Sequence, residues 1–259
     1  MSGVKIIQLT DLHLQLDETV EYKGVYPDQH LQQCLAWVAK QDYDFLLLTG
    51  DLSHAGYESA YQRLLGYMQD VEKPWYWLPG NHDDAQLMTR MHEQDVDSVR
   101  WLQAGNWQLV LLNSTHEPDG RGSGSVATAH LQQLANQIAA SDCAHTMVVL
   151  HHNPIAVDST WQDEIMLENA ASFLQVLDTD THQHVKAVLC GHIHQEQDMQ
   201  RNNVRYLGSP ATSVQFAIKQ HQFLLQPELG PGLRRLTLHD DGRIDTEVVR
   251  LAKLIQGVE

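Results

Sequence analysis

The stretch VKIIQLTDLH, residues 4–13, joins an apolar run to an aspartate and a histidine. The run Val4–Leu9 predicts a buried strand, because a short apolar run of this kind is typical of a strand covered on both faces. Similar runs recur along the chain and predict further strands at Asp44–Leu48, Pro74–Leu78, Trp107–Leu112, Thr146–Leu150 and Val185–Cys190.

Segments with helical spacing lie between most of these runs. Three sets of apolar residues mark helical faces: Leu31, Cys34, Leu35 and Val38; Tyr61, Leu64, Leu65 and Met68; Leu131, Leu134 and Ile138. This alternation of strands and helices predicts a layered α/β fold. Nothing in the 259 residues indicates a linker or an internal repeat, so we expect a single domain over residues 1–259.

The C-terminal part of the chain predicts strands without intervening helices. These strands are expected at Arg205–Leu207, Gln222–Leu225, Gly232–Leu238 and Arg243–Val249. Because Asp240-Asp241-Gly242 is a turn signal, the last two are expected to form a hairpin at about residues 230–250. We expect this half of the sheet to be antiparallel.

Five predicted strands end in residues that can bind metals. These ends are Thr10-Asp11-Leu12-His13, Gly50-Asp51, Gly80-Asn81-His82-Asp83, His151-His152 and Gly191-His192-Ile193-His194. In an open α/β sheet, ligands bind beyond the carboxyl ends of the strands, so distant segments can converge there. The shared position at strand ends predicts a metal site.

The spacing of the side chains adds detail to this prediction. Asp11 and His13 are two residues apart, so in extended backbone both side chains point to the same face and reach one cation. Asp51 has two carboxylate oxygens and can bridge two metals about 3.5–4 Å apart. The glycines at 50, 80 and 191 suit a chain that approaches ions closely, because glycine has no Cβ and is free in φ.

Each of these motifs also has an ordinary structural explanation. An aspartate after a strand often caps a helix, and Gly-Asn-His-Asp can be a plain turn. His151 can be a core histidine with a backbone partner, and His192 with His194 can be an exposed polar turn. All five motifs at strand ends are much harder to explain in this way, so the sequence favours the metal site.

The composition excludes several classes of protein. The formal net charge is −16 and no basic run is present, so a nucleic-acid polymer is not an expected partner. No stretch is long or apolar enough to span a bilayer, so we expect no membrane association. Three cysteines without metal-binding spacing suit a reducing compartment. We therefore expect a cytoplasmic protein that is not exported.

Histidine is the one unusual residue in the composition. The chain has 16 histidines, and neutral imidazole is a common ligand for transition metals. Seven of them lie in polar stretches and are interpreted as surface residues: His30, His92, His116, His130, His182, His184 and His221. The short stretch Gly120–Ser125 is interpreted as a surface loop.

The ordered motifs resemble those of the calcineurin-like metallophosphoesterases. In that family D-x-H is followed by G-D, G-N-H-D/E, a single H and G-H-x-H, and every element is present here between about Lys5 and Pro210. Three segments look most like the bacterial class III cyclic-nucleotide phosphodiesterases: Leu150–Pro154, Cys190–Glu196 and Ser213–Phe216. The resemblance implies a four-layer αββα sandwich of mixed sheets, with a dinuclear metal site at the strand ends.

The resemblance also implies how seven ligands divide between two metals. One metal would be held by Asp11, His13, Asp51 and His194, and the other by Asp51, Asn81, His151 and His192. His152 would support or pack against the site. The family's metals are iron, manganese or zinc, with iron and manganese favoured, and the mixed donors agree with a first-row transition metal. Proteins of this type are often dimers, so we expect a homodimer.

The expected reaction is hydrolysis of 3′,5′-cyclic AMP to 5′-AMP. Two cations that share Asp51 are expected to share a hydroxide, which attacks phosphorus in line with the leaving oxygen. His82 is not needed as a ligand, so it is assigned as the catalytic acid that protonates the 3′ oxygen. The expected substrate contacts are His13, Asp51, Asn81, His82 and His194. Asp83 is expected to orient the loop.

Other functions remain open at this stage. The same site can cleave a glycerophosphodiester, a 2′,3′-cyclic nucleotide or an aryl phosphate. A nuclease is disfavoured by the acidic charge, and a non-catalytic scaffold by the complete set of motifs. Specificity is expected from the loops Leu14–Pro27, Asn113–Val126, Asn153–Glu168 and Gly208–Phe216. Trp161 and Phe216 can stack on a purine or pack under a loop.

Overall fold

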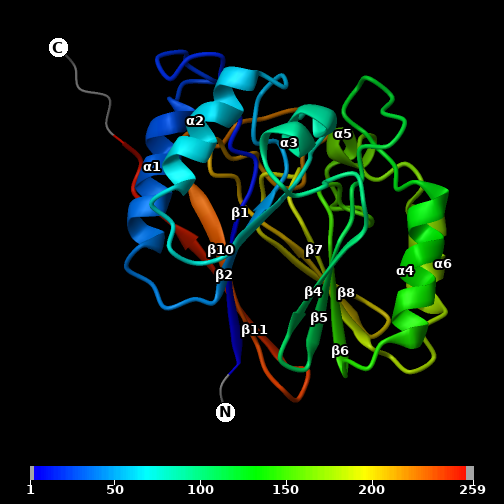
Figure 1. The fold of residues 1–259 in the computed structure, drawn as a ribbon. Coiled ribbons are helices and arrows are strands. Elements are labelled where there is room, and N and C mark those ends of the chain that lie inside the picture. The colour runs from blue at the N-terminus through cyan, green and yellow to red at the C-terminus, as the bar shows by residue number, and fades with distance from the viewer. Residues whose placement is uncertain (1–2, 255–259) are drawn as a thin grey trace.

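Two β-sheets pack face to face between two layers of helices in this computed structural model, which describes residues 3–254 (Figure 1). The first sheet has the strand order β11-β10-β1-β2-β3. Its strands are β1 (Val4–Leu9), β2 (Phe45–Thr49), β3 (Trp75–Leu78), β10 (Gly232–Leu238) and β11 (Ile244–Arg250). β10 is antiparallel to both β1 and β11, whereas β1, β2 and β3 run parallel.

The second sheet has the order β4-β5-β6-β7-β9-β8. Its strands are β4 (Arg100–Ala104), β5 (Trp107–Leu111), β6 (His145–Val149), β7 (Val185–Cys190), β8 (Gln197–Arg201) and β9 (Val204–Gly208). The four inner strands β5, β6, β7 and β9 run parallel, and the edge strands β4 and β8 are antiparallel to their neighbours.

Helices cover the outer face of each sheet (Figure 1). Those over the first sheet are α1 (Pro27–Val38), α2 (Glu58–Met68) and α3 (Ala85–Met91), and those over the second are α4 (Thr128–Ala140) and α6 (Ala170–Asp178). The short α5 (Thr160–Asp163) lies among the loops beyond the strand ends, against Ile193 and Phe216. Leu31 and Tyr61 pack α1 and α2 against the first sheet. Leu134 and Phe173 pack α4 and α6 against the second. A separate apolar cluster that includes Leu47 fills the space between the sheets. The four-layer αββα prediction is therefore confirmed.

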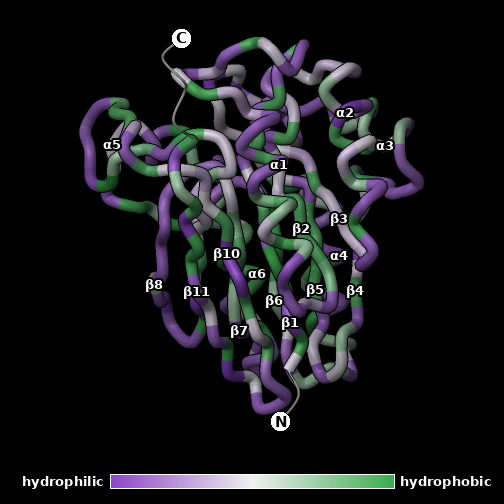
Figure 2. The backbone as a smooth tube through the Cα atoms, turned by 90° about the vertical axis from the view of Figure 1, so that its left-hand side faces the viewer, coloured by the Kyte–Doolittle hydropathy of each residue, from purple (hydrophilic) through white to green (hydrophobic). Residues whose placement is uncertain are grey.

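The inner strands are largely apolar because each lies between a helix layer and the opposite sheet. β2 and β5 are buried at every residue. In Figure 2 these central strands are green, whereas β8 at the edge is largely purple. The predicted bounds of β1, β7 and β10 are confirmed without a shift. The apolar runs of β1 and β7 end where these strands leave the core.

The structure corrects three strand predictions. Residues 222–225 form no strand, since Phe223 and Leu224 are exposed and Leu225 makes only an isolated bridge. β4 and β8 were not predicted, because an edge strand with one polar face has no continuous apolar run. The C-terminal strands are not one antiparallel half of a sheet: β10 and β11 join the first sheet, while β9 is parallel to β7 in the second.

The topology brings the carboxyl ends of seven strands to one edge of the sandwich. Three belong to the parallel run β1-β2-β3 of the first sheet and four to the run β5-β6-β7-β9 of the second. Since the sheets are stacked, the loops after these strands meet across the gap between them. Residues far apart in the sequence thus become neighbours at this edge.

Candidate metal centre

The seven predicted ligands lie together just beyond the ends of β1, β2, β3, β6 and β7. Six of them are buried and Asn81 is partly buried: Asp11, His13, Asp51, Asn81, His151, His192 and His194. Among the described residues, four groups of three side chains have ligand atoms within 4.8 Å of one another. Two of them are His13, His54 and His82, and His151, His152 and His192; the other two overlap at Asp11. Asp11, His13 and His194 form one group, and Asp11, Asp51 and His151 form the other.

The backbone at these positions differs from the expectation of extended geometry. Asp11 has a φ of 53° and His13 a φ of 49°, and Asp51, His192 and His194 are also left-handed. The prediction that extended backbone aligns Asp11 and His13 is therefore wrong, although both side chains do reach the same place. Non-glycine residues at positive φ cost free energy and cluster at functional sites, so five of them at one strand edge indicate a constructed site.

All three predicted glycines matter because they have no side chain, and Gly50 also because of its conformation. Gly50 has a φ of 95°, and a Cβ there would collide with the ring of His151. A Cβ on Gly80 would collide with the Asp51 carboxylate and lie 2.7 Å from Nε2 of His151. A Cβ on Gly191 would collide with Thr10 and lie 3.0 Å from Oδ2 of Asp11. Close approach to the ligands therefore requires glycine at these positions.

Asp51 lies between the two halves of the centre. Its Oδ1 is 3.4 Å from Nε2 of His151, and its Oδ2 is 3.6 Å from Nε2 of His13. Its Oδ1 also accepts a hydrogen bond of 2.9 Å from the backbone N–H of His82. Each carboxylate oxygen therefore faces a different group of histidines, which is the arrangement needed for a carboxylate shared by two cations.

Backbone carbonyl groups fix the orientation of three ligand histidines. Nδ1 of His151 donates to the carbonyl of Thr49 at 2.8 Å, and Nδ1 of His194 donates to that of Val214 at 2.7 Å. Nε2 of His192 donates to the carbonyl of Ile165 at 3.0 Å. Because one nitrogen of each ring carries this proton, the other nitrogen is left as the donor to a metal.

Polar atoms without partners provide the test of whether a metal fits. Among the described residues, Nε2 of His151 and Oδ1 of Asn81 are buried and have no hydrogen-bond partner. Nε2 of His194 lies 3.2 Å from Nε2 of His13 and 3.3 Å from Oδ1 of Asp11. Buried polar atoms are normally paired, so these converging nitrogen and oxygen atoms fit a bound cation.

The electrostatics of the pocket point the same way. Burial lowers the pKa of His151, but the neighbouring charges of Asp51 and Asp11 and the hydrogen bond to the Thr49 carbonyl outweigh burial and raise the pKa to about 9. The pKa of Asp51 lies well below its usual value because His151, His82 and His13 outweigh the effect of burial. The surrounding groups therefore favour positive charge at this point despite burial.

His152 supports the centre and does not offer a free ligand nitrogen. Its Nδ1 is 2.8 Å from Oγ of Ser114, and its Nε2 donates to the carbonyl of Gly122 at 3.1 Å. Burial is the main cause that lowers the pKa of His152 to about 3. This arrangement corrects the prediction that residues 120–125 are a surface loop, because Ser123, Gly124 and Ser125 are buried behind His152.

His82 and Asp83 have different tasks in the turn after β3. Nδ1 of His82 donates to the carbonyl of His54 at 2.6 Å, which leaves Nε2 of His82 as its second polar atom. Asp83 accepts hydrogen bonds from the N–H groups of Leu52, Ser53 and Gly80. Asp83 therefore holds the loop, as predicted. Burial is the main cause that raises its pKa to about 6.

Sequence reasoning missed two residues beside His13. Nδ1 of His54 lies 3.3 Å from Nδ1 of His13, and the ring of His54 stacks on that of His82 with centroids 5.0 Å apart. The ring of Tyr22 stacks on His13 at 4.7 Å. His54 stands three residues after Asp51, and this short spacing from a ligand is the signal that could have found it.

His30 corrects one surface assignment. Its side chain is buried, and its Nδ1 donates to the carbonyl of Ser213 at 2.9 Å. Oγ of Ser213 in turn donates to the carbonyl of Asp11 at 2.6 Å. His30 therefore anchors the loop that holds the backbone of a candidate ligand.

The aromatic residues Trp161 and Phe216 pack with each other. The Phe216 ring stacks on His194 with centroids 4.0 Å apart and an interplanar angle of 11°, and the Trp161 ring meets Phe216 edge-on at 5.3 Å. Phe216 is buried. The structure therefore favours packing for Phe216, with one face of the ring covering a candidate ligand.

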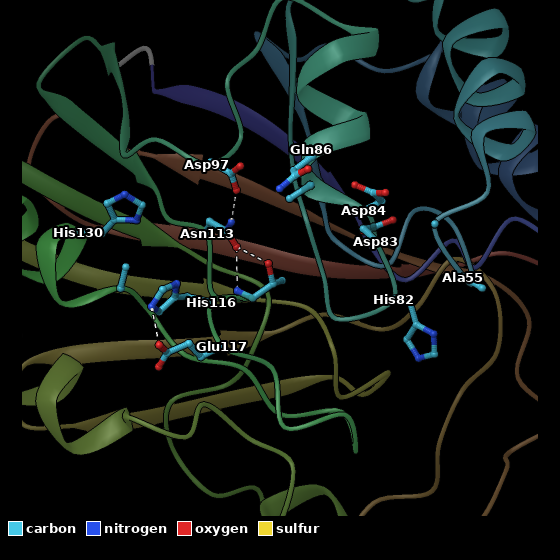
Figure 3. A pocket seen from close by; sticks show the side chains of 14 residues that line it. Ala55, His82, Asp83, Asp84, Gln86, Asp97, Asn113, His116, Glu117 and His130 are labelled. Atoms are coloured by element: carbon cyan, nitrogen blue, oxygen red, sulfur yellow. Dashed lines mark hydrogen bonds and ion pairs between the residues drawn. The ribbon is translucent and has the colours of Figure 1, made fainter.

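A cavity of about 870 Å³ opens beside the centre (Figure 3). His82 is shared by the centre and the cavity wall. The turn after β3 and the start of α3 form one side, and residues 113–117 with the start of α4 form the other. A cavity of this size can hold a small organic molecule next to the predicted catalytic residue.

A two-sheet α/β sandwich with histidines and carboxylates gathered at the strand ends defines the class of metal-dependent hydrolases. The family model described as calcineurin-like phosphoesterase matches residues 4–196. The chain belongs to the calcineurin-like phosphoesterase family, as the motifs indicated.

Curated relatives match nearly the whole chain. The 3′,5′-cyclic-nucleotide phosphodiesterase alr5338 of Nostoc sp. is 37% identical over 96% of this chain and 92% of its own length. The 3′,5′-cyclic adenosine monophosphate phosphodiesterase CpdA of Escherichia coli is 35% identical over 96% of this chain and 90% of its own. The CpdA of Vibrio vulnificus is 33% identical over 97% of this chain and 91% of its own length.

Solved structures share the fold at much lower identity. Purple acid phosphatase PPD1 from yellow lupin matches with a TM-score of 0.66 and 14% identity, over 96% of this chain and 54% of that protein. GAP50 of Plasmodium matches with a TM-score of 0.61 and 11% identity, over 99% of this chain and 90% of that protein.

Within residues 3–254, none of the helices has the length and apolar character needed to cross a bilayer.

Proposed function

We propose that the protein hydrolyses 3′,5′-cyclic AMP to 5′-AMP at a dinuclear metal centre. The names of three relatives, which are 33–37% identical over at least 96% of this chain, support the cyclic-nucleotide substrate. The position of Asp51 carries the dinuclear part of the proposal. Its two carboxylate oxygens face different histidines, so one side chain can serve two ions.

The candidate ligands form two sets that share Asp51. Asp11, His13 and His194 complete the first set, and Asn81, His151 and His192 complete the second. Their imidazole, carboxylate and amide donors suit first-row transition metals, so iron or manganese is favoured and zinc is the alternative. When bound, such ions neutralise the phosphoryl oxygens and lower the pKa of water from 15.7 towards ~7.

The remaining chemistry belongs to residues of this chain. His13, Asp51, Asn81, His82 and His194 surround the position proposed for the phosphoryl group. The carbonyl of His54 holds Nδ1 of His82 in its protonated state, so His82 acts as an acid through a second proton on Nε2. In this role His82 stabilises the phosphoryl oxygens and gives its proton to the departing 3′ oxygen.

The proposed reaction is a balanced hydrolysis. The oxygen of water forms a bond to phosphorus while the bond between phosphorus and the 3′ oxygen breaks. The proton that leaves the attacking water passes to solvent, and His82 supplies one proton to the 3′ oxygen and regains it from solvent. The product 5′-AMP keeps its phosphate on the 5′ oxygen, so opening the ring at the 3′ side predicts 5′-AMP and not 3′-AMP.

Hydrolysis of 3′,5′-cyclic AMP tests this proposal, together with metal analysis of the same sample. The wild-type protein is expected to release 5′-AMP, as followed by ³¹P NMR. His82→Ala should lower kcat by roughly 10²–10⁴-fold while the metal content stays the same, because His82 is proposed as an acid and not as a ligand. His182→Ala removes an exposed histidine and serves as the control.

Other outcomes would redirect the proposal. Cleavage of bis-p-nitrophenyl phosphate without cleavage of cyclic AMP would keep the metal centre and replace the substrate with another phosphodiester. Inactivity on both substrates with metals bound would favour a non-catalytic role. An unchanged kcat in His82→Ala would remove the acid role from His82.

A further inference from the structure

The proposed hydrolysis assigns no role to the cavity beside His82. Of the residues that line it, His82 alone belongs to the proposed catalytic machinery. The 3′ oxygen of the substrate has to lie next to His82 to receive a proton. The ribose that carries this oxygen, and the base attached to the ribose, therefore begin at the mouth of the cavity.

The charge of the lining restricts what the cavity can hold. Among the described residues that line it there is no lysine or arginine, whereas the carboxylates of Asp84, Asp97 and Glu117 are exposed along it (Figure 3). Carboxylates repel a second phosphate group and accept hydrogen bonds from hydroxyl and amino groups. An uncharged nucleoside fits this lining better than a polyanion does.

In the wall of the cavity opposite α3, the polar side-chain groups of Asn113 already form hydrogen bonds within the protein. Oδ1 of Asn113 accepts from the backbone N–H of Thr115 at 2.8 Å and from its hydroxyl group at 2.7 Å. Nδ2 of Asn113 donates to Oδ1 of Asp97 at 2.9 Å. Asn113 therefore stiffens this wall, and its amide has little capacity left for a ligand.

Gln86 is different because its amide remains available. It lies in the first turn of α3, its side chain is exposed, and the described residues offer its amide no hydrogen bond (Figure 3). Nearby Asp84 uses Oδ1 to accept from the N–H of Leu87, which fixes the start of the helix and hence the position of Gln86. A free side-chain amide on a fixed helix turn is suited to reading a ligand.

Resting on the proposed function, we propose that this cavity receives the nucleoside half of the substrate and that Gln86 selects adenine. A glutamine amide has one donor face and one acceptor face, which match the N6 amino group and N7 of adenine. Guanine presents two acceptors at the same edge, O6 and N7, so a donor-only side chain such as arginine matches it better. The residue at position 86 thereby sets base selectivity.

The ratio of kcat/KM for 3′,5′-cyclic AMP to that for 3′,5′-cyclic GMP tests this proposal. The wild-type enzyme should prefer cyclic AMP. Gln86→Ala should lower the ratio about tenfold, a loss within the range of one bidentate contact to a base. Gln86→Arg should reverse the preference towards cyclic GMP, which a purely structural role for Gln86 would not produce. Gln69→Arg adds the same charge at an exposed position on the end of α2 and should keep the wild-type ratio.

Inhibition by the products provides a second readout. With bis-p-nitrophenyl phosphate as substrate, 5′-AMP should inhibit the wild-type enzyme better than 5′-GMP, and Gln86→Arg should reverse this order. An unchanged ratio in both Gln86 variants, with cyclic AMP still cleaved, would overturn the role of Gln86 alone. Failure of the wild-type enzyme to cleave either cyclic nucleotide would overturn the substrate proposal as well.

Discussion

The metal centre and the cavity beside it meet at His82 but are built in opposite ways. Asp51 and His151 are buried, and a neighbouring glycine is required for the chain to pass them. Gln86 and Asp97 in the cavity are exposed and lie at a helix start and in a loop. The centre therefore tolerates almost no substitution, whereas the cavity can change its side chains without disturbing the fold.

The largest expected effect comes from removing the shared carboxylate. Asp51→Asn preserves the shape of the side chain but removes a charge and one oxygen ligand. Hydrolysis of bis-p-nitrophenyl phosphate should fall by more than the roughly 10²–10⁴-fold typical of a single acid–base group, because both metal sets depend on Asp51. Metal analysis should show that the variant no longer holds two ions per chain.

An aspartate-to-asparagine substitution in the cavity tests whether the metal centre and the cavity are independent. Asp97→Asn should keep the full metal content, because its carboxylate contacts Asn113 and none of the candidate ligands. A loss of metal from Asp97→Asn would show that the two regions are coupled and would contradict the comparison. Full activity in Asp51→Asn would also contradict the comparison, because it would show that the metal centre tolerates the loss of this carboxylate.

A smaller effect is expected from crowding the centre. Gly80→Ala places a Cβ against Asp51 and His151, so it should lower the free energy of unfolding by roughly 1–3 kcal/mol and also reduce metal binding. Gly66→Ala is the matched control, because Gly66 is exposed in the last turn of α2 and an added Cβ there meets no neighbouring group within 4 Å. This control should stabilise the protein by up to about 1 kcal/mol. Denaturation by urea measures both values.

A narrower effect, on metal affinity alone, is expected at His54, which touches a candidate ligand without joining either proposed set. His54→Ala removes the ring beside Nδ1 of His13 and should weaken metal affinity by about 10–100-fold. Metal titration of the apo protein measures the change, with His116→Ala in the exposed cavity wall as control. Equal affinity in the two variants would show that His54 does not orient His13.

Much of the fold could be predicted because buried strands carry their own signal. The bounds of β1 and β7 follow directly from apolar runs. β8 could not be found in this way, since an edge strand is buried on one side only and its sequence is largely polar. The strand predicted at residues 222–225 was wrong for the opposite reason. This run is apolar, but Phe223 and Leu224 are exposed.

The gathering of the candidate ligands at one place was predictable, but their geometry was not. The strand-end motifs brought together Asp11, His151 and the other candidate ligands, as expected. The left-handed backbone at Asp11 could not be predicted, because it is imposed by tertiary contacts such as the hydrogen bond from its N–H to the carbonyl of Gly50. The role of His54 was missed because its contact with His13 exists only after two loops meet.

The sharing of Asp51 is the central claim, and anomalous X-ray diffraction at the iron and manganese absorption edges tests it most directly. Two metal peaks about 3.5–4 Å apart are expected in crystals of the metal-loaded protein, one on each side of the Asp51 carboxylate. A single peak, or two peaks of which only one contacts Asp51, would contradict this claim.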